Sequence, residues 1–395
     1  MEPVAKTLGD LTTQCIRCGF CLESCPTFVE TGDESKSPRG RIYLIRSVEE
    51  GKLTWDAESR TSIDTCLGCR ACETACPSGV QYGEILELAR SRMAPKPGHK
   101  LLVNTVSNPT LLKLAQKAPG KMAPAMFSKE EPQAWKPKIQ PANFPPMDED
   151  DLPEIIGEVY LLEGCAMKVL FPRVHQATRR LLRRLGFAVR EVKESCCGAL
   201  HAHSGFLDEA EKRAQHLAKT FPDNLPIVVN SAGCGSTMKE YGHVVGKGQE
   251  FVAQRTHDAS EFLWKIGLEL LLKDSPGIEA SVTYHDACHL AHGQKITQQP
   301  RNLIKAIPGI RFKELTESDM CCGSAGTYNV TNPTMARQLL ERKWRNIEAT
   351  GAHIIATGNP GCHAWIAQAA EEHGKKVRVL HTIELLEASF SGLPT

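Results

Sequence analysis

The chain has 395 residues, a length that indicates two or three domains rather than a single core. Its 47 lysine and arginine residues balance 46 aspartate and glutamate residues, and the formal net charge of +1 gives no indication of a nucleic-acid partner. The unusual count is that of cysteine, of which there are 16.

So many cysteines are typical either of a disulfide-rich secreted protein or of a metal-binding protein. The N-terminal sequence MEPVAKTLGDLTTQ has no apolar signal-peptide core, which predicts a cytoplasmic protein with reduced thiols. No stretch approaches the roughly 18 to 20 apolar residues that a transmembrane helix needs. We therefore expect no transmembrane helix, and membrane contact that is peripheral or made through a partner.

The first eight cysteines form two matched motifs, CIRCGFCLESCP at residues 15–26 and CLGCRACETACP at residues 66–77. Both follow the spacing C-x2-C-x2-C-x3-C-P, by which bacterial-type ferredoxins hold two 4Fe-4S clusters. Three thiolates of one motif bind one cluster, and the fourth cysteine, before proline, binds the other. The spacing thus predicts two clusters, with the ligand sets Cys15, Cys18, Cys21 and Cys76, and Cys66, Cys69, Cys72 and Cys25. A zinc site also uses C-x2-C pairs, but two sets of four that each end in Cys-Pro favour 4Fe-4S clusters.

The 51-residue offset between the motifs leaves room for a helix in the insert SPRGRIYLIRSVEEG. Ser37 is a capping residue, Pro38 suits the first turn, and the residues that follow give an apolar face. We therefore expect a mainly α-helical two-cluster ferredoxin domain over residues 1–94, similar to the ferredoxin half of succinate dehydrogenase iron-sulfur subunits. Arg39 and Arg41 either stabilise the charge of reduced clusters or belong to a solvated helix start.

Residues 95–155 are rich in proline and lack strand patterning, which predicts a linker with little core of its own. Within it, residues 101–115 contain two short apolar helical segments interrupted at Pro109. These segments lie either on a membrane surface or partner, or against the domains of the chain itself.

After residue 155 the pattern changes to alternating strands and helices. Strands are predicted at 158–164, 187–192 and 226–230, and again at 281–286, 310–315, 353–358 and 377–381. Helices are predicted at 175–186, 208–221 and 334–351. The repeated pattern predicts two duplicated α/β modules, at 156–277 and 278–395.

The second eight cysteines repeat in step with these modules, at offsets of 123 to 128 residues. Each module has a cysteine after its first strand, an adjacent Cys-Cys-Gly after its second and a last cysteine after its third. Since the carboxyl ends of parallel strands meet at one edge of a sheet, we expect the four thiols of a module to converge there, where adjacent thiolates suit a metal cluster. These candidate metal or redox residues are Cys165, Cys196, Cys197 and Cys234, and Cys288, Cys321, Cys322 and Cys362.

This layout resembles the cysteine-rich CCG domain of heterodisulfide reductase and its relatives. In the full form of that domain the last element is C-x2-C, whereas here Ser231 and Asn359 stand at its first position. Four cysteines suffice for a further 4Fe-4S cluster or a zinc ion, and the alternative is buried or redox-active thiols. Nearby histidines are candidates for proton carriers to an acceptor such as a quinone, or for partners of metal ligands; they are His201, His203, His285, His289 and His292.

Taken together, the order of a helical two-cluster ferredoxin, a proline-rich linker and two CCG modules resembles the iron-sulfur subunit of glycolate oxidase (glycolate dehydrogenase). The stretches GDESKSPRGRIYLIR, LLEGCA, SAGCGSTMKEYG and CCGSAGTYNVTNP carry the match. The resemblance implies a cytoplasmic subunit, peripheral on the inner membrane, that takes electrons from FAD-bearing partner subunits oxidising glycolate to glyoxylate. It passes them toward a membrane acceptor such as a quinone. No catalytic residue and no FAD are expected on this chain, which has no dinucleotide-binding glycine fingerprint.

Other interpretations share parts of the pattern. The iron-sulfur subunit of a lactate-utilisation or glycerol-3-phosphate dehydrogenase complex has the same architecture and differs in its flavoprotein partner. A heterodisulfide-reductase-like enzyme would use the CCG thiols in disulfide chemistry, against which the residues at 231 and 359 argue. A zinc-bearing structural or assembly protein is the non-enzymatic alternative.

Overall fold

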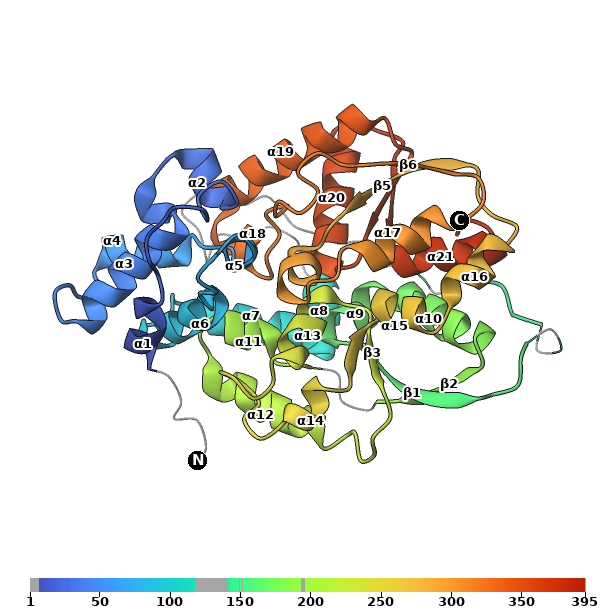
Figure 1. Ribbon diagram of the computed structural model, residues 1–395, viewed down its shortest axis with the longest axis horizontal. Coiled ribbons are helices and arrows are strands. Elements are labelled where there is room, and N and C mark those ends of the chain that lie inside the picture. Colours follow the sequence, from blue (N-terminus) through green and yellow to red (C-terminus); the bar gives the residue numbers. More distant parts are fainter. Residues whose placement is uncertain are drawn as a thin grey trace.

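The computed structural model describes residues 7–117, 141, 143–148, 150, 152–192 and 196–394. Its first part consists of helices without a strand among residues 7–117 (Figure 1). These elements are α1 (Leu8–Thr13), α2 (Pro26–Thr31), the 3-10 turn η1 (Glu34–Lys36), α3 (Pro38–Glu49), α4 (Ala57–Asp64), α5 (Ala71–Thr74), α6 (Tyr82–Arg92), α7 (His99–Ser107) and α8 (Pro109–Lys117).

Helix α3 begins as the sequence predicts. The Ser37 hydroxyl accepts a hydrogen bond from the backbone N–H of Gly40, and Pro38 occupies the first turn. Ile42 and Ile45 are buried against α1 and α6 in the core of this region. The prediction of a mainly helical N-terminal part is confirmed.

Helices α7 and α8 lie within the segment predicted as a linker. They are separated at Pro109, as the sequence indicates, and contact α9 (Cys165–Leu170) of the following module. Val103 and Leu112 are buried in these contacts, whereas Leu101 and Leu114 are exposed. This part of the predicted linker therefore packs against the chain itself, and residues 118–140 lie outside the described residues.

The first α/β module contains a four-stranded parallel sheet in the order β2-β1-β3-β4. The predicted strands at 158–164, 187–192 and 226–230 are confirmed. The sheet has a fourth strand, β4, which the sequence did not indicate because Thr-His-Asp offers no apolar run. In chain order, the elements of the module are β1 (Gly157–Leu162), α9, α10 (Pro172–Arg184), β2 (Phe187–Glu191), α11 (Ala199–His203), α12 (Leu207–Ala218), β3 (Ile227–Val229), α13 (Ala232–Lys239), α14 (Glu250–Ala253), β4 (Thr256–Asp258), α15 (Ala259–Lys265) and α16 (Leu268–Lys273).

The second module repeats this topology with the strand order β6-β5-β7-β8, again all parallel. All four strands predicted here are confirmed, as is the duplication. Its elements are β5 (Ala280–His285), the π-helical turn η3 (His289–Gly293), α17 (Gln298–Lys305), β6 (Ile310–Lys313), α18 (Tyr328–Thr331), α19 (Pro333–Thr350), β7 (Ile354–Thr357), α20 (Pro360–Glu372), β8 (Arg378–His381) and α21 (Thr382–Ser391).

The two modules share one apolar core. Val159 of β1 and Val282 of β5 belong to the same cluster of buried side chains, and α10 packs along α21 (Figure 1). Arg173 on α10 donates a 2.6 Å hydrogen bond to the Glu384 carboxylate on α21, and both side chains are buried. A buried charge needs an oppositely charged partner close by. The Arg173–Glu384 pair therefore fixes how α10 and α21 are aligned.

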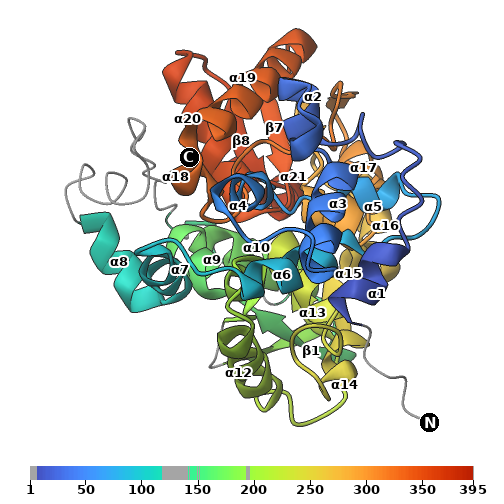
Figure 2. The same cartoon turned by 90° about the vertical axis from the view of Figure 1, so that its left-hand side faces the viewer.

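The helical N-terminal part lies across one end of both modules, as Figure 2 shows with this part toward the viewer. Arg70 forms an ion pair with Glu240, the residue that follows α13 of the first module. The Tyr328 hydroxyl on α18 of the second module donates to the Thr65 carbonyl at 3.0 Å. These contacts bring the two cysteine motifs up to the modules. Among the described residues, no helix has the length and apolar content needed to cross a membrane.

Candidate electron-transfer site

Three cavities are lined by cysteines, and all sixteen cysteines lie in the described part of the chain with none in a disulfide. The first cavity, of about 410 Å³ including its open mouth, opens near the surface. Cys18 is exposed, and burial raises the pKa of the Cys21 thiol to about 11. Besides Cys72, this cavity is lined by the four cysteines of the first predicted cluster, Cys15, Cys18, Cys21 and Cys76.

The second cavity, of about 280 Å³ including its open mouth, lies deeper in the helical part. It is lined by the four cysteines of the second predicted cluster, Cys25, Cys66, Cys69 and Cys72. All four are buried. The sulfur of Cys66 accepts hydrogen bonds from the Gly68 N–H at 3.4 Å and the Tyr82 hydroxyl at 3.6 Å.

Each set therefore offers four free thiols around one small space, three from one motif and the fourth from the other. This donor set fits a 4Fe-4S cluster, which is bound by four thiolates and whose sulfurs accept backbone hydrogen bonds. A zinc site would use the same thiol ligands, but a ribbon-type zinc site is formed by two C-x2-C pairs. It does not explain why the fourth cysteine of each set comes from the other motif.

Arg41 lines the cavity of the second cysteine set, and its side chain is only 1% exposed. Its Nη1 donates to Cys25 Sγ at 3.9 Å, and its other nitrogens donate to the Ser62 carbonyl and the Thr27 and Thr65 hydroxyls. Burial alone would lower its pKa, but nearby Cys66, Tyr82 and Cys25 raise it on balance. Both arginines considered from the sequence lie near thiols: Arg41 contacts the second cysteine set, whereas Arg39 is paired with Glu34 and lines the cavity of the first set.

The third cavity, of about 1730 Å³ including its open mouth, lies where the two modules face each other. Its wall contains all eight cysteines of the second group, which are Cys165, Cys196, Cys197, Cys234, Cys288, Cys321, Cys322 and Cys362. The four thiols of each module therefore converge beyond the strand ends, and both sets border the same space.

The thiols of each module form two corresponding hydrogen-bonded pairs, and in the second module Cys321 and Cys322 are also hydrogen-bonded to each other. In the first module the bond between Cys165 and Cys196 lowers the pKa of Cys196 to about 6 and, together with burial, raises that of Cys165. Cys197 pairs likewise with Cys234. In the second module the corresponding pairs are Cys288 with Cys321 and Cys322 with Cys362.

The glycine after each cysteine pair is required by the packing. Gly198 has φ +85° and Gly323 has φ +89°, in the left-handed region that favours glycine. A Cβ on Gly198 would lie 2.8 Å from the Ala210 carbonyl oxygen on α12, and one on Gly323 would collide with the Ala336 carbonyl on α19. The long helix of each module thus presses against the turn that presents the two thiols.

The residues that replace the family's fifth cysteine contact the last one. Ser231 and Asn359 precede α13 and α20, as the N-cap residues of these helices. The Ser231 side chain is hydrogen-bonded to Cys234, and Asn359 Nδ2 donates to Cys362 Sγ at 3.7 Å. Asn359 Oδ1 also accepts from the Gly233 N–H at 3.2 Å, which ties the two modules together at the cavity.

The second cysteine set of the helical part adjoins the cysteines of the second module. Cys69 is buried in one cluster of side chains with Cys288, Cys321 and Cys322. Burial raises the pKa of Cys69, and the nearby Cys288 raises it further. Cys66 also lines the wall of the large cavity.

Of the five histidines predicted near the cavity, three have oxygen partners, and His289 Nδ1 lies 3.8 Å from Cys288 Sγ. His292 Nδ1 is 3.0 Å from the Thr74 hydroxyl, His201 Nε2 is 3.0 Å from Asn104 Oδ1, and His203 Nδ1 is 2.7 Å from the Glu87 carboxylate. The rings of His203 and His289 stack at 4.9 Å across the two modules and line the cavity. Neither Nε2 of this pair has a hydrogen-bond partner in the part of the chain that the structure describes.

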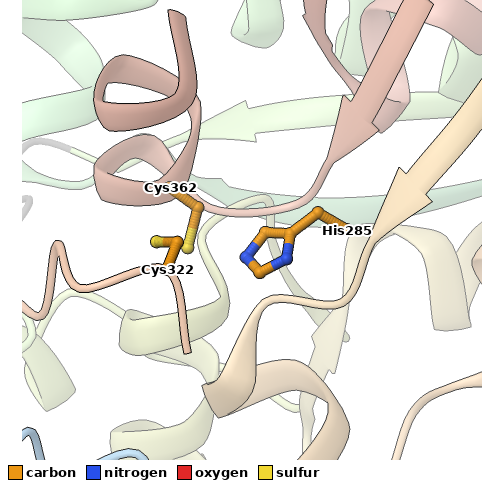
Figure 3. A group of neighbouring side chains, drawn as sticks. All are labelled: His285, Cys322 and Cys362. Carbon is orange, nitrogen blue, oxygen red and sulfur yellow. The ribbon is translucent and has the colours of Figure 1, made fainter. Parts of the chain in front are cut away.

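His285 occupies a different place. It ends β5 and lies with Cys322 and Cys362 in a tight group, their ligand atoms within 4.8 Å of one another (Figure 3). The sequence placed this histidine near Cys288 but gave no sign of the group, because its members are 77 residues apart along the chain and meet only through the parallel sheet.

Comparisons with known proteins agree with this architecture. The cysteine-rich CCG domain family matches residues 159–239 and 282–367, and the 4Fe-4S dicluster domain family matches residues 12–80. The crystal structure of a hypothetical protein from Helicobacter pylori has a similar fold, with a TM-score of 0.52 at 10% identity, over 92% of this chain and 69% of the other.

Two curated relatives cover nearly the whole chain. The probable glycolate oxidase iron-sulfur subunit of Bacillus subtilis (strain 168) is 33% identical over 94% of this chain and 92% of its own length. The glycolate oxidase iron-sulfur subunit of Escherichia coli (strain K12) is 32% identical over 94% and 93%. The chain therefore belongs to the family of glycolate oxidase iron-sulfur subunits.

Proposed function

We propose that this chain is the electron-transfer subunit of a glycolate oxidase complex. In this proposal FAD-bearing partner subunits oxidise glycolate to glyoxylate, and this chain takes the electrons and passes them toward a membrane acceptor such as a quinone. The names of the relatives and the two cysteine sets of the helical part support it. Residues 1–94, 156–277 and 278–395 would be its three domains, joined by 95–155.

The observation that carries the proposal is the order of the thiols in space. Cys18 is exposed at one end, the buried set with Cys69 follows, and Cys69 adjoins Cys288 at the wall of the large cavity. The ligand sets would be Cys15, Cys18, Cys21 and Cys76 for one 4Fe-4S cluster and Cys66, Cys69, Cys72 and Cys25 for the other. Such a cluster, when bound, accepts and releases one electron at a time.

The surface around Cys18 suits the flavoprotein side of the complex. Ile16 and Phe20, which flank it, are 68% and 69% exposed. Large apolar side chains so close together on a surface are typical of an interaction site. A partner bound there would bring its flavin near the first cysteine set and exclude water from it.

The large cavity suits the acceptor side. His203 and His289 each present a ring nitrogen without a partner in the described part of the chain, and one histidine comes from each module. Reduction of a quinone takes up protons as well as electrons, and imidazole exchanges protons near neutral pH. We propose that these two residues supply them. The eight cysteines around the cavity would hold a further 4Fe-4S cluster or zinc, or act as redox thiols. The subunit would be peripheral on the cytoplasmic face of the membrane.

The test is to measure iron, zinc and acid-labile sulfide per chain after anaerobic purification of the full chain. We expect about eight irons and eight sulfides, the content of two 4Fe-4S clusters. A content near twelve would place a further cluster in the modules and keep the relay. Protein with zinc but no iron would contradict electron transfer and favour the structural zinc protein.

A further inference from the structure

Three side chains from three separate elements of the second module form a group with the composition of a metal site. His285 ends β5, Cys322 lies in the loop before α18, and Cys362 lies in the first turn of α20 (Figure 3). One ring nitrogen and the two sulfurs all lie within 4.8 Å of one another. All three residues are buried, with exposures of 0%, 1% and 4%.

The imidazole of His285 has one polar neighbour, the thiol of Cys322. Among the residues described, neither of its ring nitrogens has an oxygen or nitrogen hydrogen-bond partner. A buried polar atom left unpaired costs about 1–3 kcal/mol, so native structures rarely keep one without reason. Thr357 lies opposite His285 in the β5–β7 register, and its hydroxyl is also without a partner in the same part of the chain. One ring nitrogen bound to a metal and the other facing Thr357 would remove the deficit.

The first module does not repeat this group. Cys197 and Cys234 correspond to Cys322 and Cys362, but the position that corresponds to His285, three residues before the first cysteine, is Leu162. Leu162 is buried and has no ligand atom. The duplicated modules therefore differ in donor chemistry at one position, and only the second offers nitrogen together with two sulfurs.

We propose that His285, Cys322 and Cys362 bind a single divalent ion of the zinc class. Zinc prefers sulfur and imidazole nitrogen, and sites with three protein ligands keep a fourth position for water or a bound molecule. Binding releases the two thiol protons, and the imidazole stays neutral. Two thiolates and one divalent cation sum to zero charge, which suits a buried site better than an unpaired charge.

The surroundings fit this assignment. Asn359 Nδ2 donates to Cys362 Sγ, as outer partners of metal ligands do. Cys322 and Cys362 line the large cavity, whereas His285 lies behind them. The fourth position therefore faces the cavity, where a ligand oxygen or sulfur can reach the ion. The inference deepens the proposed function by naming the occupant of the second module, and it rests on the proposed role of these cysteines as metal or redox groups.

The experiment compares the full chain, purified anaerobically with zinc supplied, with three variants. Zinc and iron are counted per chain, and zinc-edge X-ray absorption identifies the ligands. We expect about one zinc, with two sulfur neighbours at about 2.3 Å and nitrogen or oxygen neighbours at about 2.0–2.1 Å. H285L, which copies the first module, and C362S should each lose at least nine-tenths of the zinc. C234S, the matched change in the first module, should keep it.

The iron content separates this proposal from the proposed function. About eight irons in every variant would show that the helical part still folds, so zinc loss would then be local. A second variant, H285Q, keeps a polar side chain in case H285L does not fold, and it should also lose zinc. Zinc absent from the unchanged chain, retained in H285L and H285Q, or lost equally in C234S would each overturn the site. Iron-free protein that still binds zinc through His285 would keep the site and contradict the electron relay.

Discussion

Arg41 Nη1 donates a 3.9 Å hydrogen bond to Cys25 Sγ inside the helical part of the chain. A buried guanidinium beside cluster ligands stabilises the added negative charge of the reduced state, because the surrounding medium screens it poorly. Arg39, two residues earlier on the same helix, is paired with the Glu34 carboxylate and lines the cavity of the first cysteine set instead. Arg46, further along the helix, is paired with Glu50 and lines neither cysteine cavity, so it is the matched arginine for a test of Arg41.

We expect Arg41→Gln to lower the midpoint potential of one cluster. A hydrogen bond from a charged group contributes about 1.5–3 kcal/mol, and about 1.4 kcal/mol corresponds to 59 mV for one electron. Only the difference in this interaction between the reduced and oxidised states shifts the potential, so the drop should be on the order of tens of mV. A redox titration followed by electron paramagnetic resonance measures it, with iron content as the check on loading. Arg46→Gln, on the same helix and outside the lining of both cysteine cavities, is the control and should leave both potentials within error. Equal shifts in the two variants would contradict a specific role for Arg41.

The sequence predicted most of the strands because each is a run of β-branched or aliphatic residues bounded by polar ones. It also predicted the first turn of α3, since Ser37 and Pro38 act locally. Strand β4 was missed because a three-residue strand of Thr, His and Asp is held by its partner β3 rather than by its own pattern. The sequence is therefore sufficient to predict an element when the residues of that element alone show a clear pattern.

The site was predictable only in part, for the same reason. Strand ends gave the convergence of four thiols in each module, but the common cavity depends on how α10 packs along α21, which no short-range pattern encodes. The sequence also left Arg39 and Arg41 equivalent, because their burial depends on the helices around them. His285 was placed near the right strand end without its two sulfur neighbours.

Electron flow gives a second prediction. Cys18→Ser and Cys69→Ser should each remove one thiolate ligand, lower iron from about eight to about four per chain and stop electron transfer to the membrane acceptor. Reduction of the flavin by glycolate in the whole complex should continue, because we place that step on the partner subunits. Stopped-flow absorbance follows the flavin, and oxygen uptake by membranes follows the acceptor. Ser91→Ala, on the exposed side of α6, is the control. Unchanged oxygen uptake in both cysteine variants would contradict the proposed path.

The glycines of the two cysteine pairs give a third prediction. Gly198→Ala should destabilise the chain by about 2–5 kcal/mol, because the left-handed conformation costs roughly 1–2 kcal/mol and the contact with the Ala210 carbonyl adds about 1–3 kcal/mol. Gly248 has φ +76° with no atom within 4 Å of an added Cβ, so Gly248→Ala bears only the first cost. Urea midpoints under anaerobic conditions measure the difference. Equal loss in the two variants would mean that the helix does not press on the turn.

The last prediction concerns pH. His381 caps α21 by accepting the Ile383 N–H on Nδ1 at 3.2 Å, which requires the neutral ring. Burial lowers its pKa to about 4, with nearby His363 and His175 acting in the same direction and Glu384 opposing them. The folded pKa lies below the unfolded value of about 6.5, so this contribution to stability is complete above pH 6.5 and decreases as the pH falls toward 4.

For this histidine alone the free energy of unfolding should fall by about 2 kcal/mol between pH 7 and pH 5. His381→Asn keeps an oxygen acceptor for the cap but does not titrate, so its loss over the same interval should be smaller by about that amount. Urea unfolding followed by the fluorescence of the buried Trp344 and Trp365 measures both proteins at each pH. The comparison is between two pH values within each protein, so any constant cost of the substitution cancels. If the variant lost as much stability as the unchanged chain, protonation of His381 would not be a source of acid sensitivity, and the cap would have to tolerate the charged ring.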